Sequence, residues 1–342
     1  MKSSERILSM LNSDDLEMVI SGLTVLEALI DDEETLYEYI PCQNCSHLED
    51  LEKLFDGKHA TYLALWLLGI LTSFEVQWAL DTTEVRLRRT DLVSLPDSFE
   101  LLTQLERFSF CLHKMVELPD LFGRLTRLNM LQLNSNNMTI LPDSFEYLTD
   151  LERLDLNRNN LTELPSSFKS LTKLSTLLVS RNQLTCLSES IGQCTRLYRI
   201  LMFANRLTSL DESIGNLTQL EILNLNKNKI TELPGSFGNL TLLKSLSLRS
   251  NQLTSLPDSI ENLTQLKNLY LASNQLSDLP KSITRLTQLT TLELSRNQLT
   301  ELPESIEHLT QLEFLLLEDN NFSDSEKEKI KAMMNHVDDL QL

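Results

Sequence analysis

The sequence predicts an α/β solenoid, in which one short structural unit repeats along most of the 342-residue chain. Three observations support this prediction. A leucine recurs at a constant step of 23 residues from Leu125 to Leu309, with Cys194 once in its place. Apolar and polar residues alternate at the centre of each unit, and a Leu-Pro pair follows them. The step indicates a repeat, the alternation a short strand, and the proline a return path that is neither strand nor helix interior.

The repeats occupy residues 79–321. Nine complete units run from Leu102 to His308, with partial units at 79–101 and 309–321. Within a unit, the run Leu154-Asp155-Leu156 has the period of a strand with one buried face. No unit can bury its own leucines, so we expect the units to stabilise one another by stacking.

Position twelve of the unit is asparagine in nine successive units, from Asn136 to Asn320. An amide side chain carries donors and an acceptor, so it can satisfy backbone groups where the chain leaves the strand. The sequence therefore predicts a buried ladder of asparagines. The Leu-Pro step, as at Pro165 and Pro303, predicts an extended or turn-like return.

Both ends of such a stack need covers. Residues 1–78 lack the repeat and have apolar residues at helical spacing, as in 14–30, which predicts a helical N-terminal cap domain. Residues 322–342 open with a capping box, Ser323 to Glu326, which predicts a C-terminal capping helix that continues to about Val337.

The unit Leu-x-x-Leu-x-x-Leu-x-Leu-x-x-Asn-x-Leu-x-x-Leu-Pro-x-x-Ile/Phe-x-x resembles the 23-residue class of leucine-rich-repeat proteins, which occurs in Ras-group scaffolds and in bacterial cytoplasmic proteins. The resemblance covers about 240 of the 342 residues. It implies a curved solenoid with a parallel sheet on its concave face, and it implies that proteins bind on that face.

Charge and composition limit the partners. The net charge of −19 argues against binding of nucleic acid, which most of this surface would repel. The start of the sequence has no apolar core typical of a signal peptide, and the longest apolar run, 60–74, is too short and too interrupted for a membrane span. Five scattered cysteines fit reduced thiols. We therefore expect a cytoplasmic protein without a membrane span.

Positions six, eight and ten of each unit should face the concave side, with positions eleven and thirteen beside them. Residues 79–321 contain 23 basic and 29 acidic residues, and these five positions hold 14 of the basic and 6 of the acidic ones. The predicted concave strip is therefore basic, and a protein with an acidic surface is the expected partner. The alternative is that edge residues such as Arg158, Arg181 and Arg296 are only solvated positions of the repeat.

Apolar residues interrupt the strip near its middle. Leu178, Leu201 and Phe203 stand where neighbouring units have Asp155, Asn224 and Asn226. Arg153 and Arg199 border them. An apolar centre with an arginine rim is typical of a protein-binding hot spot. The alternative is that these side chains pack on one another and stiffen the sheet. The predicted partner-binding residues are Arg86, Arg88, Arg107, Arg153, Leu178, Arg199, Leu201, Phe203, Arg249 and Tyr270.

These patterns favour a non-catalytic protein-interaction scaffold that needs no cofactor. In the alternative interpretation, the acidic first 78 residues, with 15 Asp or Glu and 4 Lys or Arg, carry the binding as an adaptor and the solenoid is a spacer. A third and weaker one is a metal- or thiol-dependent activity at Cys42 and Cys45, with His47 and His59 completing the ligands.

Two other patterns could indicate an enzyme. Cys111 and His113, two residues apart, have the residue types of a nucleophile and a base, but His113 occupies the ladder position and no third group orients the pair. The glycines form no phosphate-binding loop. The sequence therefore predicts no catalytic residue and no metal site.

Overall fold

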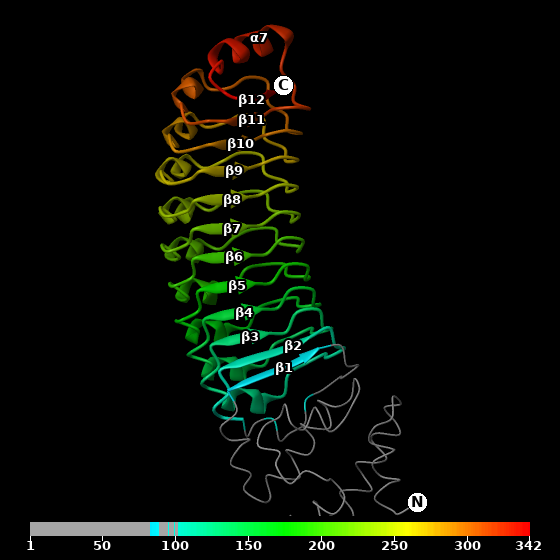
Figure 1. The fold of residues 1–342 in the computed structure, drawn as a ribbon. Helices are drawn as coiled ribbons and strands as arrows, with labels where there is room; N and C mark the ends of the chain where they lie inside the picture. Colours follow the sequence, from blue (N-terminus) through cyan, green and yellow to red (C-terminus); the bar gives the residue numbers. More distant parts are fainter. Residues whose placement is uncertain (1–82, 89–94, 96–98, 100–101) are drawn as a thin grey trace, which may run out of the picture. The chain divides into compact units, whose positions relative to one another are not determined.

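The computed structural model describes residues 83–88, 95, 99 and 102–342 (Figure 1). The chain divides into two compact units, Met1–Asn137 and Met138–Leu342, and each is described by itself. The predicted helical cap of residues 1–78 lies outside the described residues, and so do Cys42 and Cys45.

In the described part of the first unit, three parallel strands follow one another in sequence order. They are β1 (Glu84–Arg88), β2 (Arg107–Cys111) and β3 (Met130–Gln132), and the 3-10 helix η3 (Asp120–Arg124) precedes β3. Phenylalanines fill the core beneath them: the ring centroid of Phe108 lies 4.6 Å from that of Phe99 and 5.9 Å from that of Phe122.

The second unit continues the same design with nine parallel strands, each paired with its neighbours in the sequence. They are β4 (Arg153–Asp155), β5 (Thr176–Leu178), β6 (Arg199–Leu201), β7 (Ile222–Asn224), β8 (Ser245–Ser247), β9 (Asn268–Tyr270), β10 (Thr291–Glu293), β11 (Phe314–Leu316) and β12 (Asp339–Gln341). Every paired residue is offset by 23 in the repeats, so the register is the repeat itself.

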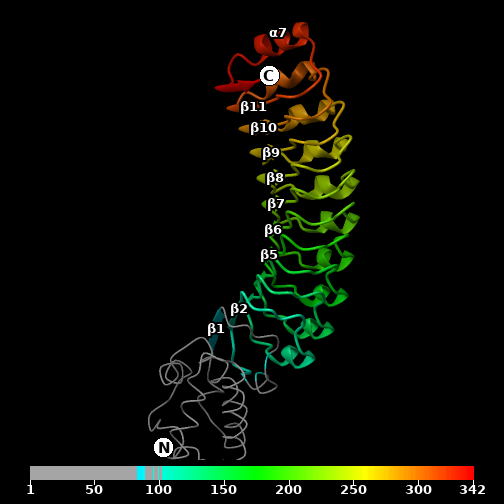
Figure 2. The ribbon, with the colours of Figure 1, turned by 90° about the vertical axis from the view of Figure 1, so that its right-hand side faces the viewer.

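A 3-10 helix returns the chain before each of the strands β4 to β11. These helices are η4 (Asp143–Tyr147), η5 (Ser166–Ser170), η6 (Glu189–Gln193), η7 (Glu212–Asn216), η8 (Gly235–Asn239), η9 (Asp258–Asn262), η10 (Lys281–Arg285) and η11 (Glu304–His308). Figure 2 shows the strands of the second unit on one side and these helices on the other. The predicted α/β repeat solenoid is confirmed, and the strand side is the predicted concave face.

Buried leucines and asparagines hold the repeats together. The leucine side chains of one unit, such as Leu151, Leu154 and Leu156, have no solvent exposure. Asn182 donates from Nδ2 to the carbonyls of Leu156 (3.0 Å) and Val179 (3.2 Å). Its Oδ1 accepts the backbone N–H of Leu161 at 3.0 Å. The same three bonds recur at Asn205, Asn228, Asn251 and Asn297. The predicted asparagine ladder is confirmed.

The residue before position twelve of the repeat adopts a left-handed backbone. Its φ is positive in ten successive repeats, before His113 in the first and before the nine ladder asparagines in the others, although none of these residues is glycine: Leu112, Ser135, Arg158, Arg181, Ala204, Lys227, Ser250, Ser273, Arg296 and Asp319. A left-handed φ costs a residue with a Cβ roughly 1 kcal/mol or more, so the ladder and the stacking hold this turn.

The C-terminal end is a helix followed by a strand. Helix α7 (Asp324–Met333) begins at Ser323, whose Oγ accepts the N–H of Glu326 at 3.2 Å, and it buries Ile330. The predicted capping helix is present, but it ends before Val337. The chain then forms β12, which pairs with β11 and which the sequence pattern did not predict.

Candidate functional site

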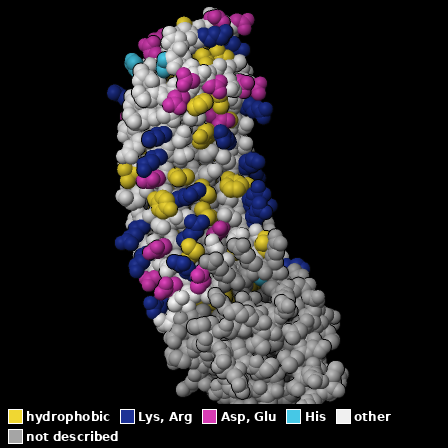
Figure 3. All heavy atoms as spheres, in the orientation of Figure 1, with side chains coloured by type: hydrophobic (Ala, Val, Ile, Leu, Met, Phe, Trp, Pro, Cys, Tyr) yellow, Lys and Arg dark blue, Asp and Glu magenta, His cyan; other side chains and the backbone are white. Residues whose placement is uncertain are grey.

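The strand-side face of the second unit brings the central predicted residues together. Leu178 and Leu201 are direct Cα partners across β5 and β6, and Arg199 pairs with Thr176 in the same register. Phe203 follows β6 by two residues. Figure 3 shows hydrophobic and basic side chains mixed on this face over the middle strands.

The three apolar residues differ in exposure. Leu178 is only 7% exposed, so it supports the surface from below. Leu201 and Phe203 are partly exposed. Solvent therefore reaches an apolar surface that Leu201 and Phe203 supply.

Backbone bonds fix the position of Phe203. Its N–H donates to Oγ of the buried Ser180 at 3.2 Å, and its carbonyl accepts the N–H of Arg181 at 2.8 Å. The guanidinium carbon of Arg181 lies 5.7 Å from the centre of the Phe203 ring. The ring is therefore presented on a rigid turn with a cation beside it.

Arginines border this surface on β4 and β6. The Nε of Arg199 is buried and has no hydrogen-bond partner among the described residues. Arg153 lies near Asp155, on the same strand. Burial raises the pKa of Asp155, while the hydrogen bond from the N–H of Asn157 and the charge of Arg153 lower it in part. Neither arginine forms an ion pair within 4 Å in the described part of the chain, so both remain available to a partner.

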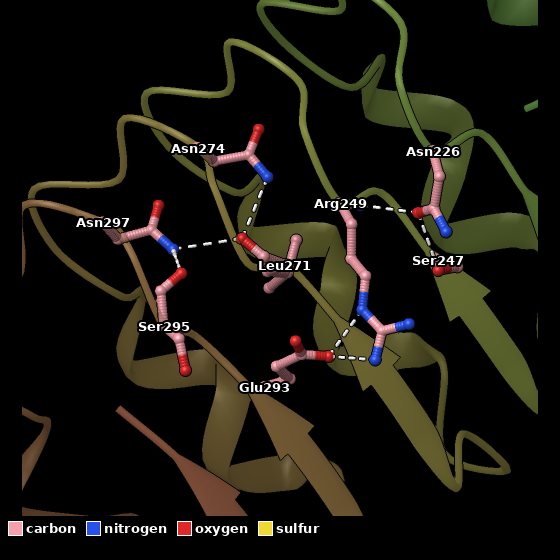
Figure 4. A network of polar contacts seen from close by, with 8 residues as sticks. All are labelled: Asn226, Ser247, Arg249, Leu271, Asn274, Glu293, Ser295 and Asn297. Carbon is pink, nitrogen blue, oxygen red and sulfur yellow. Dashed lines mark hydrogen bonds and ion pairs between the residues drawn. The ribbon is translucent and has the colours of Figure 1, made fainter. Parts of the chain in front are cut away.

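Arg249, Tyr270 and Glu293 form a closed cluster instead. The Nε of Arg249 donates to Oε2 of Glu293 at 2.6 Å, and a second guanidinium nitrogen pairs with the same oxygen (Figure 4). The guanidinium carbon lies 4.2 Å from the Tyr270 ring centre. Asn226 Oδ1 accepts the Arg249 N–H at 2.7 Å. The Arg249 charge is thus neutralised within the chain, which sequence analysis missed.

The remaining predicted residues lie in the first unit. Arg86 and Arg88 belong to β1, opposite Ser109 and Cys111 of β2, and their side chains lie outside the described ones. Arg107 begins β2 and is exposed. A role of these three residues in partner binding stays a prediction, and it concerns the first unit alone.

Cys111 and His113 are held by structural contacts. The buried thiol of Cys111 donates to Oδ1 of Asn134 at 2.9 Å. His113 is buried and stacks on Phe110, with ring centroids 3.8 Å apart. Both contacts suit a packing role at the ladder.

The two irregular repeats have a structural explanation. Where other repeats use proline before the 3-10 helix, Ser188 and Asp211 accept the N–H groups of Ser190 and Ser213. The bond from Ser213 lowers the pKa of Asp211. Cys194 replaces the opening leucine, and burial raises the pKa of its thiol to about 12. The missing prolines and the cysteine of these two repeats therefore do not indicate a binding site.

Among the residues that the structure describes, no group of three or more His, Cys, Asp or Glu side chains is arranged to hold a metal ion. Within that same part of the chain, no helix is long and apolar enough to cross a membrane.

Comparison with known families matches the repeats. A model of a leucine-rich repeat region matches residues 209–276 and 258–336, and a leucine-rich-repeat model matches residues 119–161 and 138–184. Together these spans exceed half of the chain. No curated protein matches the sequence.

Solved structures share the fold. A TDR receptor aligns with a TM-score of 0.66 and 25% identity over 73% of this chain and 45% of the receptor. A plant peptide hormone receptor, RGFR1 in complex with RGF2, aligns with a TM-score of 0.64 and 27% identity over 71% of this chain and 40% of the receptor. The internalin inlF of Listeria monocytogenes aligns with a TM-score of 0.51 and 23% identity over 80% of this chain and 92% of that one, which shows the fold alone. This chain thus spans less than half of either receptor.

Proposed function

The chain belongs to the leucine-rich-repeat proteins, and we propose that it is a non-catalytic scaffold that binds a protein partner on the strand-side face of its second unit. The observation that carries the proposal is the partly exposed pair Leu201 and Phe203, with Arg199 on the same strand and Arg153 two strands away on β4. The plant peptide hormone receptor RGFR1, solved in complex with RGF2, shares this fold, which supports the proposal of protein or peptide binding.

The chemistry of this surface fits a partner with an apolar anchor and an acidic rim. Removing the partly exposed Leu and Phe side chains from water lowers the free energy of the complex with a partner. Arginine side chains without an ion pair lose no internal partner when they bind a carboxylate. Leu178, by contrast, is too buried to contact a partner and packs beneath the exposed side chains. Arg249 and Tyr270 border the site, but the charge of Arg249 is already paired with Glu293.

Capture from a lysate with the purified protein as bait tests this proposal. The double variant L201D/F203D should lose the proteins that the unchanged bait recovers, because it places charge in the apolar centre. The matched control is F314D, which changes an exposed apolar residue on β11 of the same face. Equal recovery by L201D/F203D, with an unchanged melting curve, would sink the proposal.

We further propose a cytoplasmic location. The three described cysteines, Cys111, Cys186 and Cys194, are free thiols, which suits a reducing compartment. Accumulation of a fluorescent fusion outside the cytoplasm would contradict this part of the proposal.

A further inference from the structure

The turns that leave β4 to β7 carry a row of cations. We call the side chains at positions eleven and thirteen of the repeats the turn edge. In the central repeats, residues 148–239, the turn edge bears the exposed cations Arg158, Arg181, Arg206, Lys227 and Lys229. Figure 3 shows basic side chains gathered along the right-hand edge of this face beside the middle strands.

None of these five cations has an internal counter-ion in the part of the chain that the structure describes. Other cations of the second unit do pair: Lys173 with Asp150, Lys244 with Glu221, and Arg296 with Asp319. The five turn-edge cations form no such pair, and only Arg181 has a side-chain contact, with the Phe203 ring. Their charges are therefore free for an external anion.

The backbone holds the row in place. Position eleven has φ of 56° at Arg158, 58° at Arg181 and 55° at Lys227. The N–H groups of these three residues donate to carbonyls of the following repeat at 2.8–2.9 Å. The cations consequently start from fixed points, one strand spacing apart in successive repeats, and only their side chains must be ordered on binding.

The fold does not require these charges. In the first two of the C-terminal repeats (residues 240–321), the same positions hold Ser250, Gln252, Ser273 and Gln275, with φ of 56° and 59° at the two serines. The third has Arg296, which is paired with Asp319 of the last. The turn is therefore the same with and without a cation. Free basic charge on the turn edge is a property of the central repeats alone within the second unit.

We propose that the turn edge of the central repeats binds an extended acidic peptide segment. Four repeats at about 4.8 Å span roughly 15 Å, which an extended chain crosses in about four or five residues. Such a segment would lie across the turns, and its Asp or Glu carboxylates would pair with cations of successive repeats. Glu163 and Glu232, at position sixteen of the first and last of these repeats, disfavour a longer polyanion such as nucleic acid.

Fluorescence anisotropy with a labelled peptide of about six glutamates tests the proposal. The full chain should bind this peptide at low ionic strength, bind it more weakly as salt rises, and ignore the matched glutamine peptide. The variant R158N/R181N/R206Q/K227N/K229Q should bind about tenfold more weakly or worse. Asparagine is chosen at position eleven because it tolerates a left-handed backbone.

Two controls separate this surface from the one formed by Leu201 and Phe203. The charge-preserving variant R158K/R181K/R206K should keep peptide binding, and L201A/F203A, which adds no charge beside Arg181, should keep most of it. Unchanged binding by the neutralised variant would overturn the inference. Tighter binding of an oligothymidylate of equal length than of the glutamate peptide would overturn it too, since the edge would then be a nucleic-acid site.

Discussion

The central repeats and the C-terminal repeats of the second unit share one backbone and differ in surface chemistry. Both have the buried leucines, the ladder asparagine and the left-handed residue before it. In the central repeats, the partly exposed Leu201 and Phe203 lie beside cations that form no ion pair within 4 Å among the described residues. In the C-terminal repeats, Arg249 pairs with Glu293 and lies over the Tyr270 ring, and Arg296 is paired with Asp319.

This difference separates residues that build the solenoid from residues free to serve a partner. Positions that point into the core are nearly invariant along the array, because each repeat must stack on the next. Positions on the strand-side face and turn edge vary between the two regions without a change of turn geometry. The side chains at these positions can therefore differ to suit a partner without a change in the fold.

The largest effect is expected in the shared ladder. Asn228 donates to the carbonyls of Met202 and Leu225 and accepts the N–H of Leu207. The carbonyl of Met202 also accepts from Asn205, and that of Leu225 from Asn251. N228A therefore leaves only the buried N–H of Leu207 without any hydrogen-bond partner. With two shared bonds lost as well, we expect a loss of about 3 kcal/mol in unfolding free energy. The same loss should follow from N274A in the C-terminal repeats. Urea unfolding measures both, and a clear inequality would show that the two regions do not share one framework.

The second effect is specific to the central repeats. A Cβ on Gly215 would lie 2.6 Å from both Cβ and the carbonyl oxygen of Ser236 in the next repeat. G215A should therefore cost about 1–3 kcal/mol through overpacking. The equivalent position in a C-terminal repeat is the exposed Glu261, and E261A should change stability by less than about 0.5 kcal/mol. Comparable melting shifts in the two variants would show that the central 3-10 helices are not packed more tightly.

The fold follows from the sequence because its signals are local and repeated. The period sets the strand register, and one position of asparagine defines the ladder. The site was only partly predictable, since it depends on side-chain reach between repeats. Arg249 at position ten pairs with Glu293 at position eight, two repeats later, and Tyr270 of the repeat between them contacts the guanidinium. The 7% exposure of Leu178 likewise depends on its neighbours and cannot be read from its column.

A third prediction contrasts two carboxylates at position eight. Burial raises the pKa of Asp155, so its charged form is disfavoured in the folded chain. As pH rises above the ordinary value of 3.8, the unfolded state loses this proton first, and the folded state loses stability. D155N keeps an oxygen acceptor for Asn157 and should gain less than about 1 kcal/mol at neutral pH, with the gain fading toward pH 3. E293Q should lose stability at neutral pH, since it weakens the pair with Arg249. Thermal unfolding across pH measures both, and a gain in E293Q would contradict this contrast.

The smallest effect tests whether the two turn edges have the same backbone. Arg158 in the central repeats and Ser273 in the C-terminal repeats have φ of 56° and 59°. Glycine removes the left-handed penalty but adds chain entropy to the unfolded state, so R158G and S273G should each gain about 0.5 kcal/mol. Differential scanning calorimetry should show similar small rises in Tm. If R158G gained much more than S273G, the central turns would be strained, and their cations would be held in place at a cost in stability. Equal gains would mean that the cations occupy a turn that is no more strained than its uncharged counterpart.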